Sequence, residues 1–168
     1  RRIGDLTLIV DCYNANPQSV RASLDVLEAQ GMAARKVAVL GSMLELGDAS
    51  RELHVAVLAD ALLRDIDLVA ATGLFAEAAE DALARVAAES TAGATPYAPA
   101  APPFASRLVV GADWSEAYPD VRDHLYGNEV VLLKASRGVA LEGILPLLEA
   151  DFGGPVATED DTGTGGQG

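Results

Sequence analysis

The sequence predicts an α/β domain in which a mostly parallel sheet is covered by helices on both faces. Short apolar runs alternate with longer segments of helical periodicity. The runs are apolar throughout, which is typical of strands buried on both faces. The predicted strands are Leu6–Val10, Val37–Leu40, Leu68–Ala71, Leu108–Val110 and Val130–Leu133.

The first two helices are predicted from caps and periodicity. Asn16 can cap a helix that begins at Pro17, because the N–H that proline lacks is unpaired at that position in any case. Gly31 is expected to end this helix. A second helix is predicted to begin at Ser50. The apolar faces comprise Val20, Leu24 and Leu27 in the first helix and Leu53, Val57 and Ala61 in the second.

Three further helices are predicted at about 76–88, within 113–126 and at about 139–149. Asp113 and Glu116 have the spacing of a capping box, although Pro119 leaves the start of this helix open. Pro146 is expected to kink or shorten the last helix. Residues 91–106 hold four prolines and no charged residue, which predicts an irregular surface loop. We therefore predict one domain over residues 1–150 and a flexible glycine-rich, acidic tail over residues 151–168.

Composition excludes several classes of partner. The 168 residues include 12 Lys and Arg against 25 Asp and Glu, a net charge of −13. Nucleic-acid binding needs a basic footprint, so neither a nucleic acid nor an anionic membrane surface is expected as a partner. No apolar run approaches the ~20 residues of a membrane span. The single cysteine, Cys12, excludes an internal disulfide and suits the cytoplasm.

Polar clusters follow three of the predicted strands, where ligands bind in parallel α/β folds. The first runs from Asp11 to Pro17. Its carboxylate suits a ribose diol and the following helix start suits an anion, but the cluster also fits a plain polar turn. The second runs from Gly41 to Gly47. There we favour a loop in which Met43, Leu44 and Leu46 pack down and Glu45 is solvated.

The third cluster, Lys134 to Gly138, follows the last strand and is expected to open the last helix. Ser136, Arg137 and free backbone N–H groups there suit a carboxylate, and a serine cap beside two solvated cations is the equal alternative. His54 is expected to pack or cap and His124 to be exposed, so no metal site is predicted. The sequence contains no phosphate-binding G-x-x-x-x-G-K-[ST] loop and no G-x-G-x-x-G or G-x-S-x-G motif.

Together the three clusters resemble the Mur ligases, specifically the type that adds D-alanyl-D-alanine. The similar blocks are Asp11-x-Tyr13-Asn14-Ala15-Asn16-Pro17-x-Ser19, Val39-Leu40-Gly41-x-Met43-Leu44-Glu45-Leu46-Gly47 with Ser50 and His54, and Leu133-Lys134-x-Ser136-Arg137 with Leu141-Glu142. Their order and spacing agree with the family from about Leu6 to Leu148.

The resemblance implies the C-terminal domain of a three-domain ATP-dependent ligase. Its fold would be a Rossmann-like, three-layer domain with about six strands, one of them antiparallel. The complete ligase would join D-alanyl-D-alanine to UDP-N-acetylmuramoyl-tripeptide in peptidoglycan precursor synthesis. ATP would activate the tripeptide carboxylate as an acyl phosphate, with Mg²⁺ neutralising charge. The ligase's own N-terminal and central domains would be partners, and the central domain would bind most of the ATP and Mg²⁺. The chain alone would then be inactive.

The resemblance also implies roles for individual residues. ATP would be contacted by Asp11, through its ribose, and by Tyr13 and Asn14; the dipeptide side would be formed by Asn16, Lys134, Ser136 and Arg137. The chain departs from the family pattern at Cys12, at Ser42 in place of Asp and at Ala135 in place of Gly. Ala135 adds a Cβ to a loop where the family has glycine, which permits a closer backbone approach. The alternatives are a sister Mur ligase, a folylpolyglutamate synthase or a non-catalytic interaction module.

Overall fold

The computed structural model describes residues 1–31, 34–92 and 104–154. Most of the predicted loop at 91–106 and of the predicted tail at 151–168 therefore lies outside the described residues. Asp151 and Phe152, which were assigned to the tail, are the last two residues of a helix. The Tyr118 hydroxyl donates a hydrogen bond of 2.6 Å to the Asp151 carboxylate, so the folded domain extends past residue 150.

The sheet has six strands in the order β1-β2-β6-β3-β4-β5. All five predicted strands are confirmed, and each is one residue longer than predicted. β1, which pairs antiparallel to β2, is too short to leave a pattern in the sequence, and all other pairs are parallel. The bounds are β1 Arg2–Ile3, β2 Leu6–Asp11, β3 Lys36–Leu40, β4 Leu68–Thr72, β5 Leu108–Gly111 and β6 Val130–Lys134.

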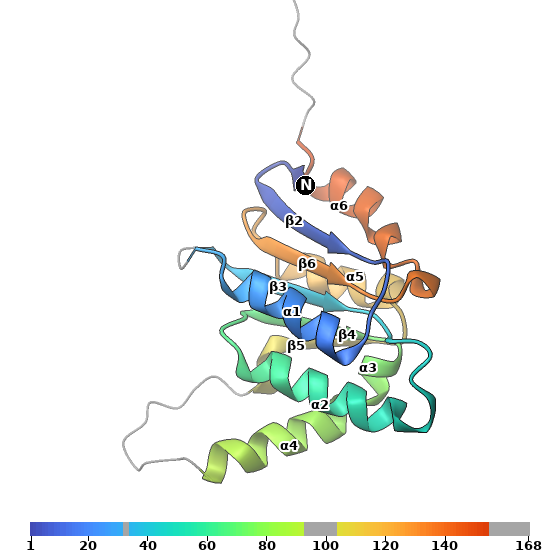
Figure 1. Cartoon of the computed structure of the whole chain (residues 1–168). Coiled ribbons are helices and arrows are strands. Elements are labelled where there is room, and N and C mark those ends of the chain that lie inside the picture. Colours follow the sequence, from blue (N-terminus) through green and yellow to red (C-terminus); the bar gives the residue numbers. More distant parts are fainter. Residues whose placement is uncertain (32–33, 93–103, 155–168) are drawn as a thin grey trace, which may run out of the picture.

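Helices cover both faces of this sheet (Figure 1). One face carries α1 (Pro17–Glu28), α2 (Ser50–Leu63), α3 (Leu74–Glu77) and α4 (Ala79–Ala92); the other carries α5 (Trp114–Asp123) and α6 (Leu145–Phe152). Alternate residues of each inner strand enter the two cores: Ala38 and Leu40 of β3 pack under α1 and α2, whereas Val37 and Val39 pack with the opposite layer. The predicted α/β, Rossmann-like three-layer fold is confirmed.

Two of the predicted helices differ in their bounds from the structure. α1 ends at Glu28 with Ala29 as its C-cap, because the apolar pattern stops at Leu27; Gly31 does not end it. The helix predicted at 76–88 is two helices, α3 and α4, and α4 reaches Ala92.

The segment after β6 is not one continuous helix. It forms two 3-10 turns, η3 (Arg137–Val139) and η4 (Leu141–Ile144), before α6. Ala140 between the turns has a left-handed backbone with φ of 53°, which interrupts any α-helix. α6 begins only at Leu145, with Pro146 in its first turn, where a missing N–H costs nothing. The third polar cluster therefore opens a 3-10 turn and not an α-helix.

The start of α5 confirms one half of the predicted capping box. The Asp113 side chain caps the helix by accepting from the N–H groups of Ser115 and Glu116. The Glu116 carboxylate accepts instead from the Ala112 N–H at 2.6 Å, so the reciprocal bond of a capping box is missing. Pro119 lies inside the helix.

Strand order decides where the polar loops meet. β6 is inserted between β2 and β3, and these three strands run parallel. In register, Lys134 at the end of β6 pairs with Asp11 of β2 on one side and with Leu40 of β3 on the other. The loops that follow the three strands are therefore neighbours at one edge of the sheet.

Candidate functional site

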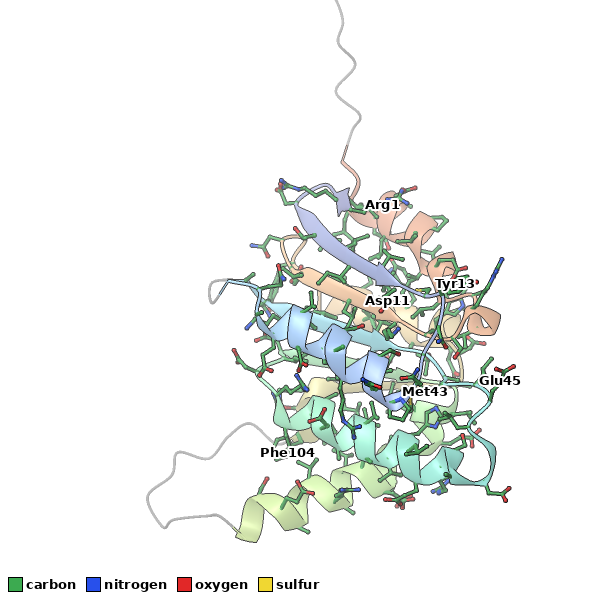
Figure 2. All side chains as sticks on the ribbon, in the orientation of Figure 1. Arg1, Asp11, Tyr13, Met43, Glu45 and Phe104 are labelled. Atoms are coloured by element: carbon green, nitrogen blue, oxygen red, sulfur yellow. The ribbon has the colours of Figure 1, made fainter. Side chains whose placement is uncertain are left out.

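The three polar clusters predicted from the sequence come together at the carboxyl ends of β2, β6 and β3. Figure 2 labels Asp11, Tyr13, Met43 and Glu45 along this edge. Backbone hydrogen bonds join the loops after β3 and β6. The Gly41 N–H donates to the Lys134 carbonyl at 2.8 Å, and the Ser136 N–H donates to the Ser42 carbonyl at 3.1 Å.

Lys134 holds the first loop in place from inside the protein. Its side chain is 1% exposed, and its ammonium group lies 2.8 Å from Oδ2 of Asp11. The same group donates a hydrogen bond to the Asn14 carbonyl. A buried ammonium with two such acceptors fixes the position of both residues. Lys134 therefore lies beneath the surface of the site.

Asp11 keeps one carboxylate oxygen available. The Ser23 hydroxyl donates to Oδ2 at 2.8 Å, where Lys134 also binds, and within the described ranges Oδ1 has no partner. Partial burial raises the pKa of Asp11, but the hydrogen bonds from Lys134 and Ser23 together outweigh it and hold the pKa below its ordinary value. The side chain, 43% exposed, is thus an ionised acceptor open to a ligand. Ser23 lies twelve residues away and gave no signal in the sequence.

Ser136 connects all three loops. Its hydroxyl accepts a hydrogen bond from the Leu44 N–H at 3.0 Å and donates to the Ala15 carbonyl at 3.4 Å. The alternative interpretation of Ser136 as a helix cap is wrong, because its side chain makes no capping bond to the turn that follows.

Asn16 caps α1 as predicted. Its side-chain oxygen accepts from the Ser19 N–H at 2.9 Å, and the Ser19 hydroxyl accepts from the Asn16 N–H at 3.0 Å. Ser19 thus completes a capping box, whereas the sequence predicts only the Asn16 cap. A ligand-binding role for Asn16 stays a prediction.

A pocket of about 170 Å³ lies between the loops. Its lining comprises Tyr13, Asn14, Leu44, Glu45, Ser136, Arg137 and Gly138. A second hollow of about 350 Å³ adjoins it, lined by Val10, Cys12, Tyr13, Arg137 and Glu142. The Arg137 guanidinium stacks 5.5 Å from the centre of the Tyr13 ring, so this pair separates the two spaces.

The loop after β3 is only partly as predicted. Met43 is buried and Glu45 is exposed, but Leu44, expected to pack down, is 41% exposed at the pocket. Glu45 has a left-handed backbone with φ of 63°. Ser42, which departs from the family pattern, accepts a hydrogen bond from the Leu74 N–H at 2.9 Å and so anchors the start of α3.

His54 supports this loop from below, as expected for a packed histidine. It is fully buried, Nε2 accepts from the Met43 N–H at 3.0 Å, and Nδ1 lies 2.7 Å from the Ser50 carbonyl. Burial lowers the pKa of His54. The ring is therefore neutral, with its proton on Nδ1. His124 is exposed, as predicted.

Cys12 is half-buried beneath the second hollow. Burial, followed by the Glu142 and Asp11 carboxylates, raises the pKa of its thiol to about 11. The thiol is protonated near neutral pH and is a poor nucleophile.

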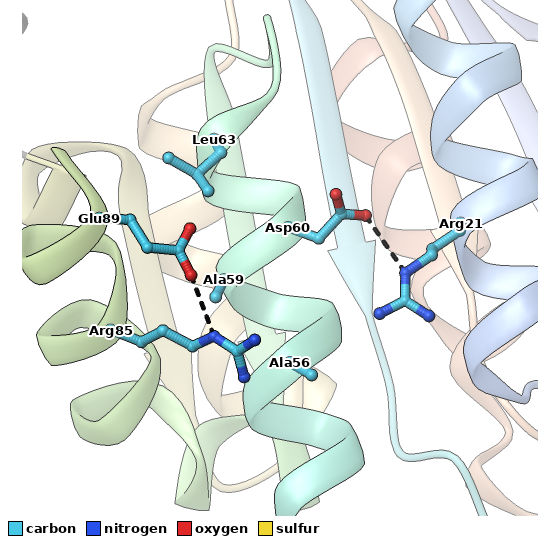
Figure 3. A pocket seen from close by; sticks show the side chains of 7 residues that line it. All are labelled: Arg21, Ala56, Ala59, Asp60, Leu63, Arg85 and Glu89. Carbon is cyan, nitrogen blue, oxygen red and sulfur yellow. Dashed lines mark hydrogen bonds and ion pairs between the residues drawn. The ribbon is translucent and has the colours of Figure 1, made fainter. Parts of the chain in front are cut away.

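A further pocket of about 220 Å³ is lined by residues of α1, α2 and α4 (Figure 3). Its two arginines are already paired: Arg21 lies 3.6 Å from Asp60, and Arg85 lies 3.2 Å from Glu89. Within the described ranges, no group of three or more His, Cys, Asp or Glu side chains is arranged to hold a metal ion. No helix in that part of the chain has the length and apolarity to cross a membrane.

Comparisons with known proteins agree on one family. The family model for the Mur ligase glutamate ligase domain matches residues 1–137. The chain is 32% identical over 141 residues to the UDP-N-acetylmuramoyl-tripeptide–D-alanyl-D-alanine ligase of Bacillus subtilis. It is 35% identical over 153 residues to the ligase of the same name from Mycobacterium tuberculosis. These alignments cover 83% and 87% of the chain but only 27% and 29% of the relatives.

Structural comparison gives the same result. A crystal structure of MurF from Acinetobacter baumannii superposes with a TM-score of 0.71 at 27% identity, covering 89% of this chain and 29% of that one. The chain thus spans less than a third of the length of these relatives. It belongs to the Mur ligase family and has the fold of that family's C-terminal domain.

Proposed function

We propose that this chain is the C-terminal domain of a cytoplasmic bacterial ligase that uses ATP to join D-alanyl-D-alanine to UDP-N-acetylmuramoyl-tripeptide. The similar ligases carry this name, and the chain corresponds to 27–29% of their length. The observation that carries the proposal is the convergence of three loops at one edge of the sheet. Ionised Asp11 ends β2 there, and Arg137 lines the pocket between the loops and makes no ion pair within the described residues. A carboxylate can accept from ribose hydroxyls and a guanidinium can bind a carboxylate, so these two groups suit a nucleotide and a small zwitterion.

Asp11 is the proposed contact for the ATP ribose. Its free Oδ1 can accept hydrogen bonds from the ribose hydroxyls, while Lys134 and Ser23 hold Oδ2. Tyr13, 75% exposed, and Asn14 stand beside it on the same loop and form the nucleotide side of the cleft.

Arg137 is the proposed contact for the dipeptide carboxylate. It is exposed at the pocket, and Tyr13 stacks against its guanidinium. The planar fork can bind a carboxylate through two parallel hydrogen bonds. We assign Lys134 and Ser136 positioning roles, since both are buried and already bonded to the loops that they hold.

The phosphate and metal chemistry is proposed to come from other domains. The sequence has no phosphate-binding loop, and the described residues form no site for Mg²⁺. Mg²⁺ would neutralise phosphate charge in the complete ligase. Purified 1–168 should therefore release no ADP from ATP above the rate of a buffer blank.

The proposed function is tested on the complete reading frame that encodes this chain. The purified product should form UDP-N-acetylmuramoyl-pentapeptide and ADP from the tripeptide, D-alanyl-D-alanine and ATP. Asp11→Ala should raise the KM for ATP by roughly ten- to a hundred-fold and change the KM for the dipeptide less. A complete product that ligates no dipeptide, or ATP turnover by 1–168 alone, overturns the proposal. An unchanged KM for ATP in Asp11→Ala overturns only the ribose assignment.

A further inference from the structure

The pocket between the three loops carries two unpaired charges of opposite sign. Glu45 and Arg137 both line it. Within the described residues neither side chain makes an ion pair, although both are exposed to solvent. Most other arginines of the domain are paired with carboxylates; Arg21, Arg64 and Arg85 are examples. A pocket that keeps one cation and one anion apart matches a ligand with the complementary pair of charges.

The backbone holds Glu45 in an uncommon conformation. Its φ of 63° lies in the left-handed region, which a residue with a Cβ seldom adopts. The preceding residue is fixed: the Leu44 N–H is bonded to the Ser136 hydroxyl, and the Leu44 side chain packs against Gly138. Strained residues persist where surrounding structure holds them, and they concentrate at ligand sites. The Ser136 tether therefore helps to hold Glu45 at the pocket that Arg137 also lines.

We infer that Glu45 is the specificity-determining residue for the amino end of the dipeptide. Its carboxylate binds the ammonium group of D-alanyl-D-alanine, and Arg137 binds the carboxylate at the other end. A volume of about 170 Å³ suits a molecule the size of a small dipeptide. The inference rests on the proposed function and deepens it. It assigns Glu45 as the residue that distinguishes a dipeptide with a free amine from one whose amine is acylated.

The assignment has a specific energetic signature. A hydrogen bond between two charged groups is about twice as strong as one between neutral groups. The complete ligase should therefore bind N-acetyl-D-alanyl-D-alanine, which lacks the ammonium group, roughly ten-fold or more weakly than the dipeptide. Glu45→Gln keeps the size of the side chain and removes its charge, so it should abolish most of this preference.

The experiment compares three forms of the complete ligase: the parent, Glu45→Gln and Asp48→Asn. Asp48 is a nearby exposed carboxylate that does not line the pocket, so its variant is the matched control for general loss of negative charge. The measured quantities are the KM values for D-alanyl-D-alanine and ATP and the Ki of N-acetyl-D-alanyl-D-alanine. Glu45→Gln should raise the dipeptide KM roughly ten-fold or more while ATP KM and the acetylated Ki stay within about two-fold. Asp48→Asn should change none of them.

A second variant separates recognition from folding. Glycine adopts the left-handed region without strain, so Glu45→Gly should raise the Tm of 1–168, by about 2–4 °C. In the complete ligase the same variant should lose dipeptide affinity as Glu45→Gln does. A more stable domain that recognises its substrate less well cannot be explained by damaged structure.

Each outcome has one meaning. If Glu45→Gln leaves the dipeptide KM unchanged in an active ligase, or weakens the dipeptide and its acetylated form equally, the role of Glu45 is overturned and the proposed function stands. If the parent enzyme does not ligate D-alanyl-D-alanine, both are overturned. If Asp48→Asn matches Glu45→Gln, the effect is one of net charge, and the inference is again rejected.

Discussion

Lys134 and Arg137 are three residues apart, yet one is buried beneath the site and the other is exposed at its surface. Lys134 is buried, where it makes an ion pair with Asp11 and donates a hydrogen bond to a backbone carbonyl. Arg137 is exposed and contacts only an aromatic ring in the described structure. Removing Lys134 leaves Oδ2 of Asp11 and the Asn14 carbonyl without their buried donor, so the first loop loses the group that holds it. Lys134 variants should therefore report on loop integrity, and Arg137 variants on ligand binding.

Arg137→Lys tests the carboxylate assignment in the complete ligase. Lysine keeps the charge but loses the planar fork, so kcat/KM for the dipeptide should fall by roughly ten-fold or more. The KM for ATP should stay nearly unchanged. A solvated arginine without a ligand would instead give a change of no more than about 0.5 kcal/mol. A higher KM for ATP with normal dipeptide kinetics would show that the loop binds ATP and not the dipeptide.

His54 makes the stability of the domain depend on pH. Its folded-state pKa lies below the ordinary value of 6.5, because burial disfavours the imidazolium and Nε2 accepts from the Met43 N–H. The unfolded chain therefore takes up a proton first as pH falls. The contribution of His54 is fully present above pH 6.5 and declines as pH falls from there toward the folded-state pKa. The contribution of Asp11, whose pKa is lowered from 3.8, is lost only in more acidic solution.

The measurement uses His124→Gln, which leaves His54 as the only histidine of the chain. Titration of its ring protons by NMR should give a pKa below 6.5. In urea denaturation, the difference in unfolding free energy between His124→Gln and the double variant His54→Gln/His124→Gln should be smaller at about pH 5 than at about pH 7, and this difference cancels the effect of the falling net charge. A ring pKa at or above the ordinary value would contradict the neutral, hydrogen-bonded state of His54.

At the scale of elements, the local patterns were sufficient for the strands and for most helix starts. Buried strands such as β3 and β6 are apolar at every position, and Asn16-Pro17 marks the start of α1 by its own chemistry. These features depend on neighbours within a few residues. A short segment of sequence is therefore enough to predict such strands and helix starts.

Features that depend on distant partners were not predictable. The insertion of β6 between β2 and β3 leaves no local pattern, although it decides which loops meet. The hydrogen bond from Ser23 to Asp11 and the one from the Leu44 N–H to Ser136 also join separate segments. Ala140 has a left-handed backbone and breaks the predicted last helix. Because it is neither glycine nor asparagine, the sequence gives no signal of this conformation. The candidate residues were identified in the sequence, but their division into contacting and positioning groups required the structure.

Gly41 and Ala135 provide a test of coupling between the loops after β3 and β6. A Cβ added at Gly41 would lie 2.8 Å from the Ala135 Cβ and 3.0 Å from Val139 Cγ1. Gly41→Ala should therefore destabilise 1–168 by about 1–3 kcal/mol. The additional change Ala135→Gly removes the closer clash, so the double variant should recover much of this loss.

The double-mutant cycle is measured by urea denaturation. A coupling energy of about 0.5 kcal/mol or more, with the double variant more stable than the sum predicts, supports direct contact between the loops. Additive effects would show that another neighbour such as Val139, and not Ala135, limits the space for a Cβ at Gly41. Gly31→Ala is the matched control, because a Cβ there meets nothing within 4 Å.

At the scale of the whole molecule, negative charge dominates. The chain carries −13 over 168 residues. Ion pairs offset part of the repulsion: Arg64, 14% exposed at its side chain, bonds to Asp25, Glu28 and Asp60 and so joins α1 to α2. Exposed ion pairs, such as Arg51 with Asp81, contribute little individually. Repulsion among unpaired carboxylates should therefore exceed the attraction that exposed pairs provide.

This balance predicts that salt stabilises the domain. Raising NaCl from about 0.01 M to about 0.15 M shortens the screening length from roughly 30 Å to roughly 8 Å. Long-range repulsion is screened more than the short contacts of Arg64, so the Tm of 1–168 near pH 7 should rise by about 2–4 °C. The same series near the isoelectric point of about 4.3 is the control, because the net charge is then close to zero and the effect should largely disappear. A Tm that falls with salt near pH 7 would mean that ion pairs such as those of Arg64 outweigh the repulsion, and that the acidic surface is balanced locally despite the net charge.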